Sequence, residues 1–167
     1  MVKIKYKEMP HMKPITIETK SKGFFGGIWM WIATSRKWEI TQDFLFTIDS
    51  TNYMIPKGFI FDGASVPKYF RSWLSPMGVL LVGGLVHDYA YKYETLRLSG
   101  KKPKALTKKT QKWCDQLFRD INIDVNGFKI INYGAYYALR LGGWLAWNGH
   151  RKRNCKWDDG LKVKSSL

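Results

Sequence analysis

Cysteine is scarce in this chain, which contains only Cys114 and Cys155 among its 167 residues. Two cysteines are too few for the disulfide framework of a small secreted domain, and neither has a second Cys or a His at zinc-finger spacing. The sequence therefore predicts a protein of a reducing compartment, folded without disulfide scaffolding.

Long apolar runs are also missing. Charges and prolines break up residues 1–18, so no signal peptide is expected. The apolar stretch at 23–33 is too short to span a bilayer, and the one at 128–147 is interrupted by Lys129 and Arg140. We expect no transmembrane segment.

Acidic residues are few: 13 Asp and Glu stand against 28 Lys and Arg, giving a net charge of +15. With 45% hydrophobic and 16% aromatic residues the chain can still build a full core, which excludes general disorder. A surface this basic attracts nucleic acid, an anionic lipid surface or another acidic partner.

Residues 1–61 have the pattern of β-strands. Apolar residues alternate with lysines at 2–6 and with polar residues at 15–18, and β-branched and aromatic residues are frequent in 37–48 and 53–61. With a turn expected at 49–52, the economical prediction is an antiparallel meander whose first strand is a lysine-protected sheet edge.

Helical spacing follows residue 62. We expect a short turn at 68–74 and helices over 78–98, 108–121 and 128–147, the second capped by Thr107. Two of these helices are predicted to turn apolar stripes to the core. They comprise Trp113, Leu117, Phe118 and Ile121 in the second helix, and Ile130, Tyr133, Tyr137, Leu141 and Trp144 in the third.

Strands first and helices second predict an α+β fold. We expect a single domain over residues 1–147, with strands in about 1–61 and helices in about 66–147. The polar, basic residues 148–167 are predicted to form a C-terminal tail.

The densest cluster of chemically useful side chains is around His87. On a helix His87 and Tyr91 share a face one turn apart, whereas Asp88 points about 100° away. Asp115 belongs to the next helix, which a short loop can return antiparallel. A bond from Asp115 to the imidazole would leave the other ring nitrogen free to act as a base toward water. The alternative is a structural His-Asp pair.

The turn DGASVP, at residues 62–67, allows a second chemistry. Ser65, His87 and Asp115 are the residue types of an acyl-transfer triad. The turn lacks the second glycine of a nucleophile elbow, however, and Asp62, Gly63 and Ser65 suit a turn and helix cap. Capping is favoured, and a nucleophile or a ligand contact stays open.

Basic residues gather in two places beside this cluster. Lysines near aromatic side chains suit lipid headgroups as well as nucleic-acid phosphates, although a simply solvated positive face is equally compatible. The candidate anion-binding residues are Lys101, Lys102, Lys104, Lys108, Lys109 and Lys112 in the loop and helix start, and Arg151, Lys152 and Arg153 at the start of the tail.

Residues 86–118 resemble the catalytic helices of phospholipase A2, especially the disulfide-free version in parvovirus capsid proteins. The resemblance is carried by the order of H-D-x-x-Y, a basic loop and C-D-Q-L-F. The resemblance implies that His87 activates water, Asp115 orients it and Tyr91 supports it by hydrogen bonding. It also implies calcium, held by Asp88, as a cofactor; no other cofactor is expected.

A second resemblance covers about residues 59–142. The D-G-A-S-V-P turn, the H-D-x-x-Y helix and the following C-D-x-x-F helix are similar to a family of small uncharacterised proteins of tailed phages and prophages. This implies a viral protein in the host cytoplasm or the virion, with other phage proteins as possible partners, and brings no established reaction.

Three functions are therefore open. The first is a small phospholipase A2-like esterase that uses His87 and Asp115. The second is a non-enzymatic phage component or accessory protein that binds DNA or an acidic partner. The third is a serine-type hydrolase of a cell-envelope polymer.

Overall fold

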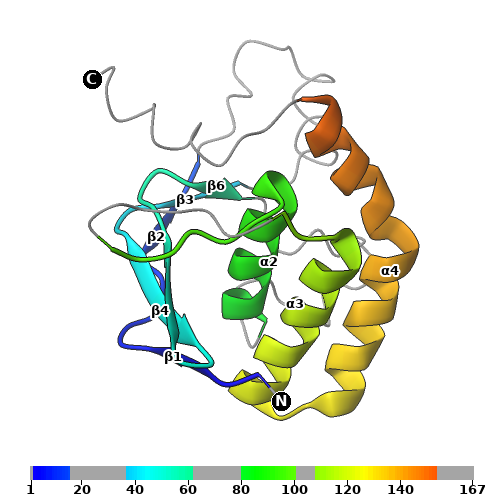
Figure 1. The fold of residues 1–167 in the computed structure, drawn as a ribbon, viewed down its shortest axis with the longest axis horizontal. Coiled ribbons are helices and arrows are strands. Elements are labelled where there is room, and N and C mark those ends of the chain that lie inside the picture. Colours follow the sequence, from blue (N-terminus) through cyan, green and yellow to red (C-terminus); the bar gives the residue numbers. More distant parts are fainter. Residues whose placement is uncertain (1, 16–36, 62–79, 101–107, 154–167) are drawn as a thin grey trace, which may run out of the picture.

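The computed structural model describes residues 2–15, 37–61, 80–100 and 108–153. Within these residues six short strands come first and three helices follow, which confirms the predicted α+β class. The strands lie on one side of α2, and α3 and α4 lie on its other side, with α4 outermost (Figure 1).

The first sheet contains β1 (Ile4–Tyr6), β4 (Phe44–Ile48) and β5 (Thr51–Ile55), in the order β1-β4-β5. Among the described strands, β1 pairs with β4 alone, so the lysine-bearing first strand is an edge of the described sheet, as predicted. β4 and β5 form a hairpin with Phe46 opposite Tyr53. Its turn residues Asp49 and Ser50 both have positive φ, the geometry that suits a two-residue hairpin turn.

The second sheet contains β2 (Met12–Pro14), β3 (Trp38–Ile40) and β6 (Ile60–Phe61), in the order β2-β3-β6. All of its pairings are antiparallel, as they are in the first sheet. The predicted strand at 37–48 is thus divided between β3 and β4, and each half belongs to a different sheet.

Three helices form the other layer: α2 (Leu81–Tyr93), α3 (Gln111–Asn126) and α4 (Lys129–Lys152). α2 is apolar and buried along nearly its whole length, which suits its position between the strands and the other helices. The described residues include no helix that is long and apolar enough to cross a membrane.

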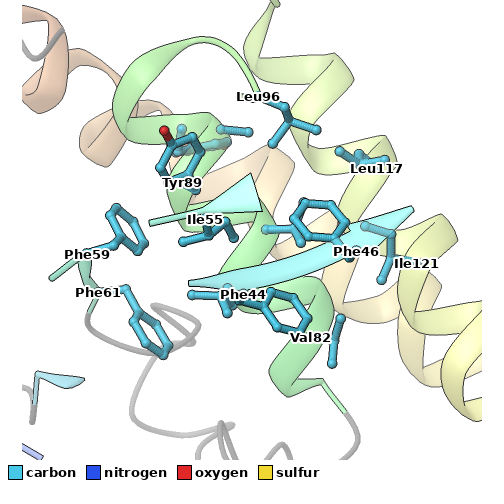
Figure 2. Close-up of a cluster of buried hydrophobic side chains, with 14 of the residues drawn as sticks. Phe44, Phe46, Ile55, Phe59, Phe61, Val82, Tyr89, Leu96, Leu117 and Ile121 are labelled. Carbon is cyan, nitrogen blue, oxygen red and sulfur yellow. The ribbon is translucent and has the colours of Figure 1, made fainter. Parts of the chain in front are cut away.

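Aromatic and branched side chains from the strands and from α2 and α3 build one core (Figure 2). Phe44, Phe46 and Ile48 alternate inward along β4, while Leu45 between them faces solvent. The predicted stripe on α3 is confirmed: Leu117 and Ile121 are buried in this core, and Trp113 packs partly buried against it. Phe118 is buried in a second, smaller cluster with Leu80 and Ala135.

The end of α2 differs from the prediction because of tertiary contacts. α2 ends at Tyr93, not at residue 98, and Glu94 adopts a left-handed conformation with φ of 56°. The residues after it pair with β5: Met54 N–H donates to the Arg97 carbonyl, and Ser99 N–H donates to that of Asn52. Residues that the sequence pattern assigns to the helix therefore form backbone hydrogen bonds with the edge strand β5.

The start of α3 also differs from the prediction. Thr110 is its N-cap and accepts a hydrogen bond from the Trp113 amide, at 3.2 Å. The predicted cap, Thr107, lies outside the described residues, and Lys108 and Lys109 precede the helix. α3 continues to Asn126, five residues beyond the predicted end, and its C-cap is Gly127 with φ of 73°.

The predicted core stripe of α4 is wrong. The helix buries Asn132, Ala135 and Tyr136 and turns the predicted stripe outward. It also continues to Lys152, five residues beyond the predicted end. The exposed stripe residues are Ile130, Tyr133, Tyr137, Leu141 and Trp144.

Candidate functional site

The carboxylate of Asp115, on α3, is the centre of a buried polar cluster that joins the three helices. Its Oδ1 accepts hydrogen bonds from His87 Nε2 at 3.0 Å and from the Tyr91 hydroxyl at 2.7 Å, both on α2. Its Oδ2 accepts one from the Arg140 guanidinium of α4 at 2.8 Å. Asp115 is fully buried, so these partners replace the water that the carboxylate loses.

The spacing on α2 explains the arrangement. His87 and Tyr91 lie one helical turn apart and reach the same carboxylate, with their rings 4.1 Å apart between centroids. Phe118, one turn after Asp115 on α3, meets the imidazole edge to face at 5.5 Å. The His-Asp-Tyr juxtaposition expected from the sequence is therefore present.

His87 is held between two carboxylates and is only 5% exposed. Its second ring nitrogen, Nδ1, lies 3.4 Å from Asp88 Oδ1, a longer approach than the bond at Nε2. Burial lowers the pKa of His87, whereas the hydrogen bonds to Asp115 and to Asp88 raise it. The raising effects together are larger, so the pKa lies above its ordinary value. The imidazole therefore holds a proton more strongly than a solvated histidine does.

Tyr91 and Cys114 are neutral in this cluster. Burial, followed by the hydrogen bond to Asp115, raises the pKa of Tyr91 far above its ordinary value, so the phenol acts as a proton donor to Asp115. Burial raises the pKa of the Cys114 thiol to about 12. Cys114 is therefore a buried apolar side chain, not a nucleophile.

Arg140 is the member of the cluster that sequence reasoning missed. It is the only charged residue between Lys129 and His150, in an otherwise apolar stretch, and that isolation is the available signal of a buried partner. Gly143, three residues later, lets α4 approach this cluster closely: a Cβ there would be 2.5 Å from the Tyr91 hydroxyl.

A second polar cluster lies at the C-terminal end of α2. The Arg151 guanidinium of α4 donates to the Tyr91 and Lys92 carbonyls at 2.9 and 2.7 Å and pairs with Glu94 at 2.9 Å. Lys108 approaches Glu94 at 2.8 Å. Burial opposes ionisation of Glu94, but Lys108 and then Arg151 lower its pKa below the ordinary value. Arg151 thus acts as a helix cap here.

The other described residues of the predicted anion-binding set form no hydrogen bond with Asp115. Lys109 lies over the Trp113 ring at 5.1 Å from its centroid, and Lys112, Lys152 and Arg153 are exposed. Lys101, Lys102 and Lys104 fall outside the described residues. So do Asp62, Gly63 and Ser65, so the predicted serine chemistry stays a prediction.

Calcium is not matched by the described donors. Within residues 2–15, 37–61, 80–100 and 108–153, no group of three His, Cys, Asp or Glu side chains could hold a metal ion. Calcium takes six to eight oxygen ligands, and Asp88, the predicted ligand, has its Oδ1 3.4 Å from His87 Nδ1, so calcium held by Asp88 stays a prediction. Tyr6 lines part of each of two surface hollows, and His87 lines neither of them.

The comparison with protein families gives one match, described as a protein of unknown function (DUF1353), over residues 38–138. The chain belongs to this family. The DUF1353 match includes β3 to β6, α2, α3 and the start of α4, and therefore His87, Tyr91 and Asp115. Arg140 and the C-terminal half of α4 follow it.

Membership in DUF1353 establishes an uncharacterised domain family and names no reaction. No curated protein and no solved structure matches the chain significantly. The expected phage origin and the phospholipase A2 resemblance stay predictions, as do the expected locations.

Proposed function

We propose that the protein is an ester hydrolase in which His87 activates a water molecule, with lipid esters as its substrate class. The observation that carries this proposal is the pair of bonds at Asp115 Oδ1, 3.0 Å from His87 Nε2 and 2.7 Å from the Tyr91 hydroxyl. A carboxylate that fixes one ring nitrogen orients the imidazole and stabilises the cation formed during catalysis.

The chemistry follows from the two ring nitrogens. Because Nε2–H donates to Asp115, the neutral imidazole has its lone pair on Nδ1. Nδ1 takes a proton from water while the water oxygen attacks the ester carbonyl carbon. The bond from this carbon to the alkoxy oxygen then breaks, and Nδ1–H returns the proton to the leaving oxygen. The products are a carboxylic acid and an alcohol.

The raised pKa of His87 fits a base that works near neutral pH. Asp88 contributes to that shift through its contact with Nδ1. Activity should therefore rise with pH as His87 loses its proton, and Asp88→Asn should move this rise to lower pH.

Lipid esters are proposed on the resemblance of residues 86–118 to phospholipase A2. The described residues contain no group of side chains that could hold calcium, and the hydrolysis by His87 is therefore written without a metal ion. The assay therefore measures fatty-acid release from mixed anionic vesicles, and hydrolysis of a soluble short-chain ester, each with added calcium and with a chelator.

A matched pair of tyrosines on α2 sharpens this assay. Tyr91→Phe removes a hydroxyl bonded to Asp115, whereas the Tyr89 hydroxyl has no hydrogen-bond partner among the described residues. We expect His87→Gln to lower kcat by about a hundredfold or more, Tyr91→Phe to lower it less, and Tyr89→Phe to preserve it. Full activity in His87→Gln would overturn the proposal, as would no hydrolysis by the folded wild type in any condition.

The second candidate is a non-enzymatic binding protein in which the Asp115 cluster only holds the helices together. The observation that favours it is the burial of the cluster, with Asp115 fully buried and bonded to both α2 and α4. In that case His87→Gln lowers the melting temperature and leaves salt-dependent binding of DNA or of an acidic partner unchanged.

The phage setting belongs to the same proposal and rests on the sequence resemblance over residues 59–142. A lipid esterase of a phage would act on host membranes, either from the host cytoplasm or carried in the virion. Immunodetection in purified particles and in infected-cell fractions separates these two locations.

A further inference from the structure

α4 exposes apolar side chains along most of its length. Ile130 is 90% exposed and Leu141 is 81% exposed, values that are unusual for large aliphatic residues on a folded domain. These residues recur at helical spacing on one face, which we call the outer stripe of α4. Its members are Ile130, Tyr133, Tyr137, Leu141, Trp144 and Leu145.

The orientation of α4 is fixed by polar contacts of side chains outside the outer stripe. Arg140 bonds to Asp115, Arg151 bonds to the end of α2, and buried Asn132 donates to the Asn126 side chain at 2.7 Å. Rotating the helix to bury the outer stripe would break all of these bonds. The outward position of the stripe is thus a property of the packed structure.

The charges of α4 suit an anionic surface. The helix contains no Asp or Glu, and its last turn contains His150, Arg151 and Lys152. Its single mid-helix cation, Arg140, points inward to Asp115. The outer stripe is therefore uncharged along roughly 22 Å of helix, with Lys129 before it and exposed Lys152 and Arg153 after it.

We propose that the outer stripe of α4 is a docking surface for anionic membranes, with α4 lying along the lipid-water boundary. Apolar residues would enter the boundary between headgroups and acyl chains, while the terminal cations contact anionic headgroups. Trp144, Tyr133 and Tyr137 favour this depth because their rings are apolar and their N–H or O–H groups are polar. This docking does not depend on catalysis by His87.

Charge favours an anionic membrane over a second copy of the chain and over nucleic acid as the partner of the outer stripe. A second copy of the chain would bring another net charge of +15 to the same face, which opposes dimerisation. Nucleic acid would meet an uncharged stripe in place of the phosphate-binding cations that it requires. An anionic lipid surface satisfies both the apolar stripe and the basic ends.

The test is co-sedimentation of the full chain with vesicles of phosphatidylglycerol and phosphatidylcholine, compared with vesicles of phosphatidylcholine alone. Leu141→Gln removes a leucine of the outer stripe, and Leu45→Gln removes an exposed leucine of β4, which is 55% exposed. We expect wild type to bind the anionic vesicles, more weakly at high salt. Leu141→Gln should weaken binding about tenfold, and Leu45→Gln should have little effect.

Several outcomes would overturn the docking surface. These are no vesicle binding by wild type, equal weakening by both leucine variants, or a dimer in sedimentation analysis that Leu141→Gln dissociates. A lower melting temperature of Leu141→Gln with unchanged vesicle binding would mean that the chain itself covers the stripe. His87→Gln should bind vesicles like wild type, so failure of catalysis and failure of docking are distinguishable.

Discussion

At the scale of single residues, Asp115 connects α3 with α2 and α4. One carboxylate accepts from an imidazole, a phenol and a guanidinium that belong to two other helices. In a buried environment these three donors depend on the one carboxylate, because its removal takes a hydrogen-bond acceptor from all of them at once.

Asp115→Asn keeps the side-chain shape and removes the charge. We expect it to lower the free energy of unfolding by about 3 to 5 kcal/mol, since Arg140 and His87 lose their counter-ion. Asp120→Asn, on the same helix, breaks only the partly exposed pair with Arg119 and should cost at most about 1 kcal/mol. Denaturant titration measures both, and equal effects would contradict the central role of Asp115.

His87 should make stability depend on pH. Because its folded-state pKa is raised, its stabilising contribution is complete below the unfolded value of about 6.5 and is lost as pH rises through the folded-state pKa. The difference in unfolding free energy between wild type and His87→Gln should therefore shrink from acidic to alkaline pH. A difference that grows with pH would show that His87 is neutral in the folded protein.

At the scale of helices, packing depends on a close approach of α4 to α2. The Tyr91 hydroxyl lies against Gly143, and the Tyr91 ring meets Trp147 edge to face at 5.2 Å between centroids. Any side chain at 143 would meet the same hydroxyl that bonds to Asp115. Packing of α4 and the geometry of the candidate site are thus coupled.

Neighbouring glycines of α4 test this coupling. Gly143→Ala should destabilise the protein and disturb the bond from Tyr91 to Asp115, because the new Cβ would lie 2.5 Å from the phenol oxygen. Gly142→Ala meets nothing within 4 Å and should stabilise the protein by up to about 1 kcal/mol through helix propensity. Thermal unfolding of the two variants should shift in opposite directions, and parallel shifts would refute the coupling.

At the scale of the whole molecule, the excess of positive charge opposes folding. With a net charge of +15, the compact chain concentrates like charges that the unfolded chain spreads apart. The partly buried pair of Asp115 with Arg140 is screened little by salt, whereas exposed lysines are screened strongly.

We therefore expect added sodium chloride to raise the free energy of unfolding up to moderate ionic strength. Denaturation by urea, which carries no charge, measures this without adding ions of its own. Falling stability with salt would mean that the surface ion pairs outweigh the net repulsion.

The sequence by itself determined the fold class and three members of the candidate site, His87, Tyr91 and Asp115. Alternation in 37–61 predicts strands, three- and four-residue spacing predicts helices, and the spacing of His87 and Tyr91 places them on one face. These features are local, because they follow from the period of each element. Asp115 is predicted as the partner of His87 because its helix is the next one along the sequence.

Only the tertiary structure decided which face of α4 is buried and where α2 ends. Periodicity reveals a stripe on a helix but not what the stripe faces. The inward face of α4 is selected by Arg140, whose partner Asp115 lies 25 residues earlier in the chain. α2 ends at Tyr93 because the residues after it pair with β5. Both decisions depend on hydrogen bonds between distant segments, which no local pattern encodes.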